Sequence, residues 1–399
     1  MVSLSIAQPP GMYTDGRYLY DRCGEQVVLR GVNEMVTWMS RNGYTFPEMA
    51  QTGMNCVRIV LITSDSASDM DQWITQCVAN QMIPMVEQHS ATGNFGALQA
   101  MVDWWVQPDV VNVIQQHEEY LIVNIANECG DFNVDQNTYT NEYTTAMNRM
   151  RQAGIHTPLV IDAPGWGLNV DVLKASAPTL YQNDPDHNVI FSSHFYGKNT
   201  WGVYMSSGQD QWLRDQMDHW VNANLPYIWG ELAKWLQECV CCGDTDTLFQ
   251  YAQEKQIGWL VWNWGPGNLD CNLMEMSNDG YYNNMTDWGM EVVVNHPYGI
   301  MNTSVRPQSM INGYCTGQLE QPIINTAEIL MPEMHIRITW MDVSHDPQED
   351  GFIIERKPFH GNDEWTEVGI VSQDYTTFVD TTDLHGLVEY TYRVGAYKE

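Results

Sequence analysis

The chain has 399 residues, which exceeds an ordinary single domain and predicts one large domain with a smaller one. Its 18 Lys and Arg residues stand against 50 Asp and Glu residues, and the formal net charge of -32 would repel nucleic acid and anionic membranes. A neutral polysaccharide is not excluded, and the 16 Trp and 20 Tyr residues supply flat rings of the kind that stack on sugars.

The start of the chain lacks a cationic segment followed by an apolar one, and no stretch approaches the roughly 20 apolar residues of a membrane span. We therefore expect no membrane partner. Nine cysteines are many for a reducing cytosol. This composition favours a secreted, extracellular protein whose signal peptide is absent from this sequence.

Up to about residue 315 the sequence repeats one theme, a short β-branched run followed by a helical stretch. Parallel strands joined by crossover helices have this pattern. Helix-compatible spacing occurs, for example, at 69–81, 210–223 and 245–255. Eight alternating units predict an α/β protein with a (β/α)8 TIM barrel at 1–315. The eight runs are 27–33, 56–61, 83–89, 121–128, 159–163, 189–196, 226–231 and 258–264.

Two of these runs end in a glutamate, namely Glu128 and Glu231. Barrel enzymes hold their catalytic residues at the C-terminal ends of the strands. Two carboxylates about 5 Å apart are what retaining hydrolysis of a glycosidic bond requires. A single glutamate at a strand end is more often solvated or salt-bridged, but two on one rim predict a glycosidase with Glu128 and Glu231 as catalytic residues.

Strict strand alternation would point Asn127 and Glu128 to opposite faces, so we expect the strand to end or bend there. Arg58 lies inside an apolar strand, where an unpaired charge is expensive, so a carboxylate partner is expected. Each such residue alone would more often be structural. Their joint occurrence at successive strand ends indicates one site.

The cysteine cluster Cys239, Cys241 and Cys242, with Cys271 downstream, could form disulfides or bind a metal. The spacing Cys-x-Cys-Cys without histidine ligands matches no ordinary zinc site, which favours disulfides. The odd total leaves at least one thiol free or bonded to another chain. We expect no metal and no cofactor.

After residue 317 the pattern changes to alternating strands without helices, at 334–340, 351–357, 365–370 and 388–394. These runs predict a small all-β, immunoglobulin-like sandwich at 322–399, joined to the barrel by a linker at 316–321. The strand near Trp340, the Gly-Phe-x-Ile-Glu-Arg strand and the closing Tyr-x-Tyr-Arg-Val strand resemble a fibronectin type III module. This module contains no pair of acidic residues suited to catalysis, so we expect it to act as a spacer, to stabilise the protein or to bind weakly.

Six motifs of the barrel, in order, resemble glycoside hydrolase family 5. They are Leu29-Arg-Gly-Val-Asn33, Asn55-Cys-Val-Arg58, Asn127-Glu128, His194-Phe-Tyr196, Gly230-Glu231 and the Trp-rich eighth run. Within the family, segments 91–93, 102–105, 165–167, 285–289 and 299–304 resemble the bacterial endo-β-1,4-mannanase branch, subfamily 8. The resemblance implies a monomeric, endo-acting enzyme that cleaves plant or algal β-mannan by a two-Glu double displacement.

The same resemblance implies individual roles. Glu128 would be the acid/base and Glu231 the nucleophile. Asn127 would bind the sugar 2-hydroxyl, and Tyr196 and Arg58 would hold Glu231. Trp262 and Trp264 would form the floor of the sugar-binding sites. The remaining orienting or rim positions are Asn33, His89 and His194.

Some positions depart from the family pattern, including Ser90, Cys129 and Lys234, and we expect these on loops that contact substrate. Hydrolysis is therefore better supported than mannan. A β-1,4-endoglucanase would use the same catalytic residues and would differ in the subsite that contacts the sugar 2-hydroxyl. A non-catalytic carbohydrate-binding barrel would have lost one carboxylate, and both are present.

Overall fold

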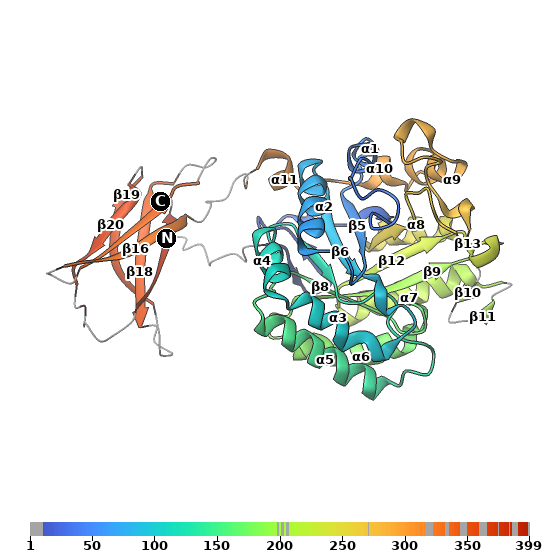
Figure 1. The fold of residues 1–399 in the computed structure, drawn as a ribbon, viewed down its shortest axis with the longest axis horizontal. Coiled ribbons are helices and arrows are strands. Elements are labelled where there is room, and N and C mark those ends of the chain that lie inside the picture. Colours follow the sequence, from blue (N-terminus) through green and yellow to red (C-terminus); the bar gives the residue numbers. More distant parts are fainter. Residues whose placement is uncertain are drawn as a thin grey trace. The chain divides into compact units, whose positions relative to one another are not determined.

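The computed structural model describes residues 11–197, 199–200, 203–204, 207–269, 271–313, 315, 322–331, 335–343, 349–358, 365–373, 375–382, 384 and 390–397. The chain divides into two compact units, one spanning Pro10–Pro307 and the other including everything from Gln308 onward (Figure 1). The predicted linker at 316–321 lies outside the described residues, so the predicted domain limits stay predictions.

Eight parallel strands of the first unit close into a barrel within the described part of the chain. Chain order continues around the ring, and β15 pairs with β4 to complete it. The predicted (β/α)8 barrel is confirmed. Its strands are β4 (Arg30–Glu34), β5 (Cys56–Leu61), β6 (Ile83–Gln88), β7 (Ile122–Asn124), β8 (Leu159–Asp162), β9 (Val189–Tyr196), β12 (Tyr227–Ala233) and β15 (Gly258–Val261).

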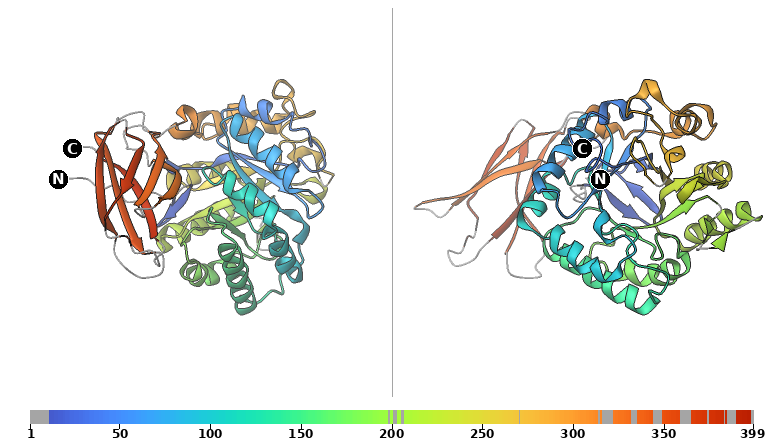
Figure 2. Two further views of the ribbon diagram at one scale, coloured as in Figure 1. Left: turned by 60° about the vertical axis from the view of Figure 1, so that its left-hand side comes forward. Right: turned by 45° about the vertical axis from the view of Figure 1, so that its right-hand side comes forward.

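Helices lie outside this ring of strands (Figure 2). Their starts follow local capping: Ser66 and Asp69 form a capping box at α2, and Asp135 and Asp244 cap α5 and α8. The longer helices are α2 (Ala67–Ala79), α3 (Leu98–Trp105), α4 (Pro108–Gln116), α5 (Gln136–Gln152), α6 (Val170–Asn183), α7 (Gln209–Ala223) and α8 (Thr245–Lys255). Shorter ones are α1 (Phe46–Ala50), α9 (Asp287–Met290) and α10 (Ile300–Thr303), whereas α11 (Gln308–Asn312) belongs to the second unit.

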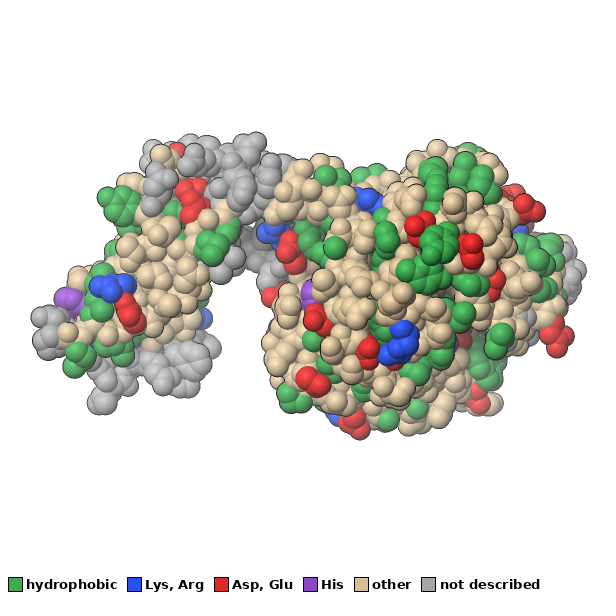
Figure 3. Space-filling view, turned by 45° about the horizontal axis from the view of Figure 1, so that its top comes forward, with side chains coloured by type: hydrophobic (Ala, Val, Ile, Leu, Met, Phe, Trp, Pro, Cys, Tyr) green, Lys and Arg blue, Asp and Glu red, His purple; other side chains and the backbone are tan. Residues whose placement is uncertain are grey.

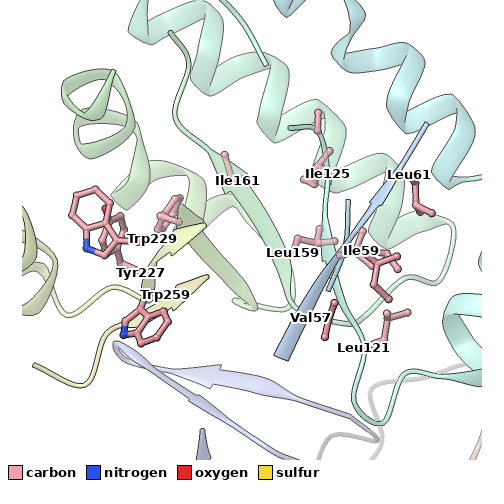
Figure 4. Close-up of a cluster of buried hydrophobic side chains, with 14 of the residues drawn as sticks. Val57, Ile59, Leu61, Leu121, Ile125, Leu159, Ile161, Tyr227, Trp229 and Trp259 are labelled. Atoms are coloured by element: carbon pink, nitrogen blue, oxygen red, sulfur yellow. The ribbon is translucent and has the colours of Figure 1, made fainter. Parts of the chain in front are cut away.

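Alternation along β5 explains how the barrel can hold a charge. Val57, Ile59 and Leu61 belong to the apolar core between strands and helices, which Figure 4 shows together with Leu159 and Ile161 of β8. Arg58 therefore points to the other side of the strand, into the barrel interior.

Smaller strands complete the first unit. They are β1 (Tyr13–Asp15), β2 (Tyr18–Tyr20), β3 (Gln26–Val27), β10 (Asn199–Thr200), β11 (Val203–Tyr204), β13 (Trp235–Leu236) and β14 (Val240–Cys241). Acidic side chains are dispersed over the face of this unit seen in Figure 3, with few basic ones among them. None of the described helices is long and apolar enough to cross a membrane.

The second unit contains two antiparallel sheets in its described residues, with strand orders β16-β17-β20 and β19-β18-β21. Ile338 and Trp340 of one sheet share a buried core with Phe352, Ile354 and Val394 of the other. The predicted all-β sandwich is confirmed at this level. Its strands are β16 (Ile323–Leu330), β17 (His335–Met341), β18 (Gly351–Pro358), β19 (Thr366–Ser372), β20 (Thr377–Asp380) and β21 (Tyr390–Tyr397), of which β16 and β20 were not predicted.

The predicted disulfides of the cysteine cluster are confirmed. Cys239 bonds to Cys271, and Cys241 bonds to Cys242. Cys23 and Cys315 are disulfide-bonded as well. Among the described residues, the free thiols are those of Cys56, Cys77 and Cys129, all buried.

Candidate active site

A cavity of about 430 Å³ opens at the C-terminal ends of the barrel strands. Five of the predicted site residues line it: His89, Glu128, Tyr196, Glu231 and Trp262. Its wall also contains residues that were not predicted as site residues, from the loops after β6, β7, β8, β12 and β15, although segments 91–93 and 165–167 include two of them. These are Thr92, Phe132, Trp166, Leu168, Leu236, Gln237, Asn268 and Met274.

The two glutamates that close predicted strands face each other in this cavity. One carboxylate oxygen of Glu128, one of Glu231 and a ring nitrogen of His194 lie within 4.8 Å of one another. This separation leaves no room for a water between the carboxylates, as an inverting glycosidase needs, and fits direct attack by one of them.

The backbone around Glu128 has the irregularity that the sequence predicts. β7 ends at Asn124, and Glu128 adopts the left-handed conformation with φ 45°. A non-glycine residue there costs about 1–3 kcal/mol, so the surroundings must hold it. They do so on both sides: the Glu128 amide donates to Asp162 Oδ2 at 3.2 Å, and its carbonyl accepts from the Gly93 amide at 2.9 Å.

Arg58 lies fully buried behind the cavity and binds the side chains around it. Its Nη1 donates to Glu231 Oε1 at 2.8 Å and to Asn33 Oδ1 at 2.9 Å. Its Nη2 donates to Asn127 Oδ1 at 2.7 Å and to Asp162 Oδ2 at 3.3 Å. One guanidinium thus fixes residues from β4, β8, β12 and the segment that follows β7.

The charge of Arg58 is maintained by its neighbours. Burial alone would lower its pKa, but the carboxylates of Glu87, Asp162 and Glu231 raise the pKa above the usual value. In return, Arg58 counteracts repulsion among acidic groups that lie close together. Removing either Arg58 or the carboxylates around it would leave uncompensated buried charge and would strongly destabilise the folded protein.

Glu231 is held at both of its oxygens. Tyr196 donates its hydroxyl to Oε2, and Arg58 donates to Oε1. Burial raises the pKa of Glu231, while the positive charges of His194 and Arg58 oppose that rise. The carboxylate is therefore fixed in orientation and partly desolvated, two properties that suit a nucleophile.

His194 connects the two glutamates. Its Nδ1 lies 2.7 Å from Glu128 Oε1 and 3.4 Å from Glu231 Oε2, and its Nε2 lies 3.6 Å from Asp162 Oδ2. Burial would lower its pKa, but Glu231 and Asp162 raise it to about 10. The three grouped side chains could in principle hold a cation, yet a protonated imidazole offers no lone pair to a metal.

The raised pKa of His194 predicts a dependence of stability on pH. The unfolded histidine has a pKa of about 6.5, so folding binds a proton between about pH 6.5 and 10. The resulting stabilisation is complete below about pH 6.5 and is lost as pH rises through about 10. We expect His194→Gln to lower the free energy of unfolding at pH 6 and to flatten its alkaline decline, as measured by urea unfolding at pH 6, 8 and 10.

The matched control is His156→Gln, which changes an exposed histidine paired with Asp186. Equal alkaline slopes in the His194 variant and the wild-type protein would show that His194 is neutral in the folded state.

Two predicted positions differ from expectation. Trp264 does not floor the cavity: it is fully buried in the core, and its Nε1 donates to Gly280 O at 2.9 Å. β15 ends at Val261, so the alternation that placed Trp264 on one face with Trp262 does not continue. Asn33 is not on the rim but buried beneath it, donating to Gly230 O at 3.0 Å.

Asp162 and Glu87 were missed as site residues. Asp162 is buried and receives bonds from Arg58, Asn124 and the Glu128 amide. Glu87 is buried, and its Oε1 lies 2.9 Å from His89 Nδ1. A signal was present, because Asp162 is the one charged residue of the apolar run 159–163 and the last residue of β8.

The unusual positions noted in the sequence lie on or beside loops whose other residues, such as Thr92 and Leu236, line the cavity, so their expected place on substrate-contacting loops stays a prediction. Ser90 accepts a bond from the Thr63 amide, Cys129 is buried beside Asn94 O, and Lys234 pairs with Glu291. None of the three lines the cavity.

Comparison with known proteins gives one family for the barrel. The model of the cellulase family, glycosyl hydrolase family 5, matches residues 20–268. Among curated proteins, the chain is 29% identical over 327 residues to a mannan endo-1,4-beta-mannosidase of Salipaludibacillus agaradhaerens, covering 78% of this chain and 99% of the relative. A Streptomyces lividans protein of the same name is 30% identical over 294 residues, covering 71% and 73%.

Solved structures agree with the sequence relatives. The mannotriose complex of a Thermomonospora fusca beta-mannanase matches with a TM-score of 0.68 at 27% identity, over 75% of this chain and 99% of that one.

Proposed function

Because the chain belongs to glycosyl hydrolase family 5, we propose that it is an endo-acting, retaining glycoside hydrolase of β-1,4-mannan. The observation that carries the retaining mechanism is the distance of at most 4.8 Å between oxygens of Glu128 and Glu231 in one cavity. The mannanase relatives and the mannotriose complex of a similar structure support the substrate.

In the first step, Glu231 attacks the anomeric carbon while Glu128 donates its proton to the glycosidic oxygen of the leaving sugar. The bond between sugars breaks and a covalent glycosyl ester on Glu231 forms. Arg58 and Tyr196 keep Glu231 aimed. His194 holds Glu128 and places a positive charge between the two carboxylates.

In the second step, Glu128 removes a proton from water as the oxygen of that water attacks the ester, which frees Glu231 and restores the acid. Asn127 bonds Arg58 through Oδ1 and Thr92 through Nδ2. Asn127 Nδ2 carries a second N–H, and this is the group that would donate to the sugar 2-hydroxyl while the bond to Thr92 stays in place.

The experiment that tests the substrate is incubation with mannans, β-1,4-glucans and xylans, followed by identification of products. We expect short manno-oligosaccharides from mannan. Preferential cleavage of a glucan would favour the endoglucanase alternative, and the absence of any cleavage would favour a non-catalytic carbohydrate-binding barrel. The subfamily 8 resemblance agrees with mannan.

We further propose that the C-terminal sandwich is a fibronectin type III-like module at 322–399, that the protein is secreted, and that it acts as a monomer. Six disulfide-bonded cysteines support an oxidising location. The separate buried core of the sandwich supports a module that folds by itself.

This separate core predicts the result of truncation. A chain that ends after residue 318 keeps Cys315 and the whole barrel, so it should stay folded and cleave soluble manno-oligosaccharide at close to the wild-type rate. The kcat on mannohexaose and the melting temperature of the barrel measure this. Insolubility, or loss of most turnover, would mean that the two units fold as one cooperative structure.

A further inference from the structure

The hairpin β13–β14 follows Glu231 directly and forms one wall of the cavity. Leu236 and Gln237 line the cavity at its tip. The pairing that holds the hairpin together is short, joining Trp235 with Cys241 and Leu236 with Val240. Trp235 at its base packs against the barrel core, whereas Gln237 and Glu238 at its tip are exposed to solvent.

The backbone of this tip is in a conformation that the sequence does not favour. Glu238 and Cys239 both have positive φ, at 58° and 56°, although neither is glycine. Two successive residues of this kind raise the energy of the tip, so a link from outside the hairpin must maintain it.

The loop that follows β15 is held by bonds among its described residues. Glu275 accepts from the amides of Gly267 and Asn268, and the Asn268 side chain donates to Cys271 O at 3.2 Å. Cys271 and Met274 are buried. This loop contributes Asn268 and Met274 to the same cavity.

The Cys239–Cys271 disulfide joins the tip of the hairpin to the loop that follows β15. Around it, Cys271 and Met274 form a small apolar cluster with Ala233, against which Tyr196 and Trp262 pack. The link therefore lies between the tip and two residues that line the site, one of which holds Glu231.

We propose that the Cys239–Cys271 disulfide is a positioning element for substrate: it fixes the hairpin β13–β14 as a wall that binds a sugar unit of the polysaccharide beyond the two units joined by the cleaved bond. This inference rests on the proposed function, since it assigns the hairpin to the binding of an extended glycan. The wall lies beside the reacting carboxylates rather than among them, so it contributes to binding and not to bond breaking.

The test is the double variant Cys239→Ser/Cys271→Ser. With the tip released, binding must order the hairpin, and the KM for mannohexaose should rise about tenfold while kcat on the same substrate changes less than twofold. The kcat/KM for an aryl mannoside, which is too short to reach the wall, should stay within twofold. Hydrogen exchange of residues 235–241, followed by mass spectrometry, should become faster.

The matched control is Cys241→Ser/Cys242→Ser, which removes a disulfide from the same hairpin without separating the two loops. It should change neither KM nor exchange at the tip by more than about twofold. A second variant, Leu236→Ala/Gln237→Ala, leaves the disulfide in place and trims the wall itself, so it should raise the KM for mannohexaose to a similar extent.

Faster exchange with an unchanged KM, a fall in kcat instead of a rise in KM, or an unchanged KM in Leu236→Ala/Gln237→Ala would each overturn the proposal. If Cys239→Ser/Cys271→Ser does not fold, the Leu236→Ala/Gln237→Ala result decides. A wild-type protein that cleaves no mannan would refute the proposed function instead, and hydrogen exchange would still test whether the disulfide fixes the tip.

Discussion

Glu231→Gln is expected to abolish cleavage of mannan, with kcat reduced by roughly ten-thousandfold or more. The amide has the shape of the carboxylate and can still accept from Tyr196, but it cannot form the glycosyl ester on which the first step depends. The initial rate of reducing-end release from mannan, measured against a blank, gives the effect.

The control for this change is Glu34→Gln, another buried glutamate at a strand end. Glu34 accepts hydrogen bonds from the hydroxyls of Ser40 and Thr45, neither of which is basic. Burial raises the pKa of Glu34 to about 7. An amide there should leave activity within about a few fold, because Glu34 does not line the cavity. If the two variants lose activity equally, Glu231 is not the nucleophile.

The site works as one electrostatic unit. Glu87, Asp162 and Glu231 would repel one another at these distances, as would Glu128 after it has donated its proton, and Arg58 with a protonated His194 supplies the opposing charge. Removing any charge shifts the pKa values of the rest. Functional effects of substitutions in this network should therefore not add.

Much of this arrangement could be predicted because its signals are local. Apolar runs mark the barrel strands, and a charged residue at the end of such a run marks the catalytic rim, which is how Glu128 and Glu231 were found. Arg58 could be given a carboxylate partner because burial of a lone charge is too expensive.

The residues that were missed or misplaced owe their positions to the point at which a strand ends, or to contacts between segments distant in the sequence. Trp264 was misplaced because β15 stops three residues early, a boundary that hydrophobic pattern alone does not fix. Asp162 is the one charged residue of the apolar run 159–163, but its role in the site comes from three partners in other parts of the barrel. The loop residues Leu236 and Gln237 lie on the hairpin β13–β14, and their place in the cavity wall depends on how that hairpin meets segments distant in the sequence.

Glu128→Gln should separate the two steps of the reaction. The variant keeps the nucleophile, so it should lose about a hundred- to ten-thousandfold in kcat on mannan, where the leaving sugar needs a proton. A dinitrophenyl glycoside needs no such proton, because its leaving group is stable as an anion. The first step should then stay fast while the second, which needs Glu128 as base, becomes slow.

The consequence is that Glu128→Gln, but not Glu231→Gln, accumulates a glycosyl-enzyme when it is mixed with the dinitrophenyl glycoside. Intact-mass spectrometry after brief exposure detects the added sugar, and peptide mapping should place it on Glu231.

Added azide should restore turnover of Glu128→Gln on this substrate, because a small anion can attack the ester without a base. An adduct on the Glu231→Gln variant, or polysaccharide turnover by Glu128→Gln at the wild-type rate, would show that the two carboxylates have been given the wrong roles. The short distance between them would then report a structural pair, and the acid of this barrel would have to be sought among the other cavity residues.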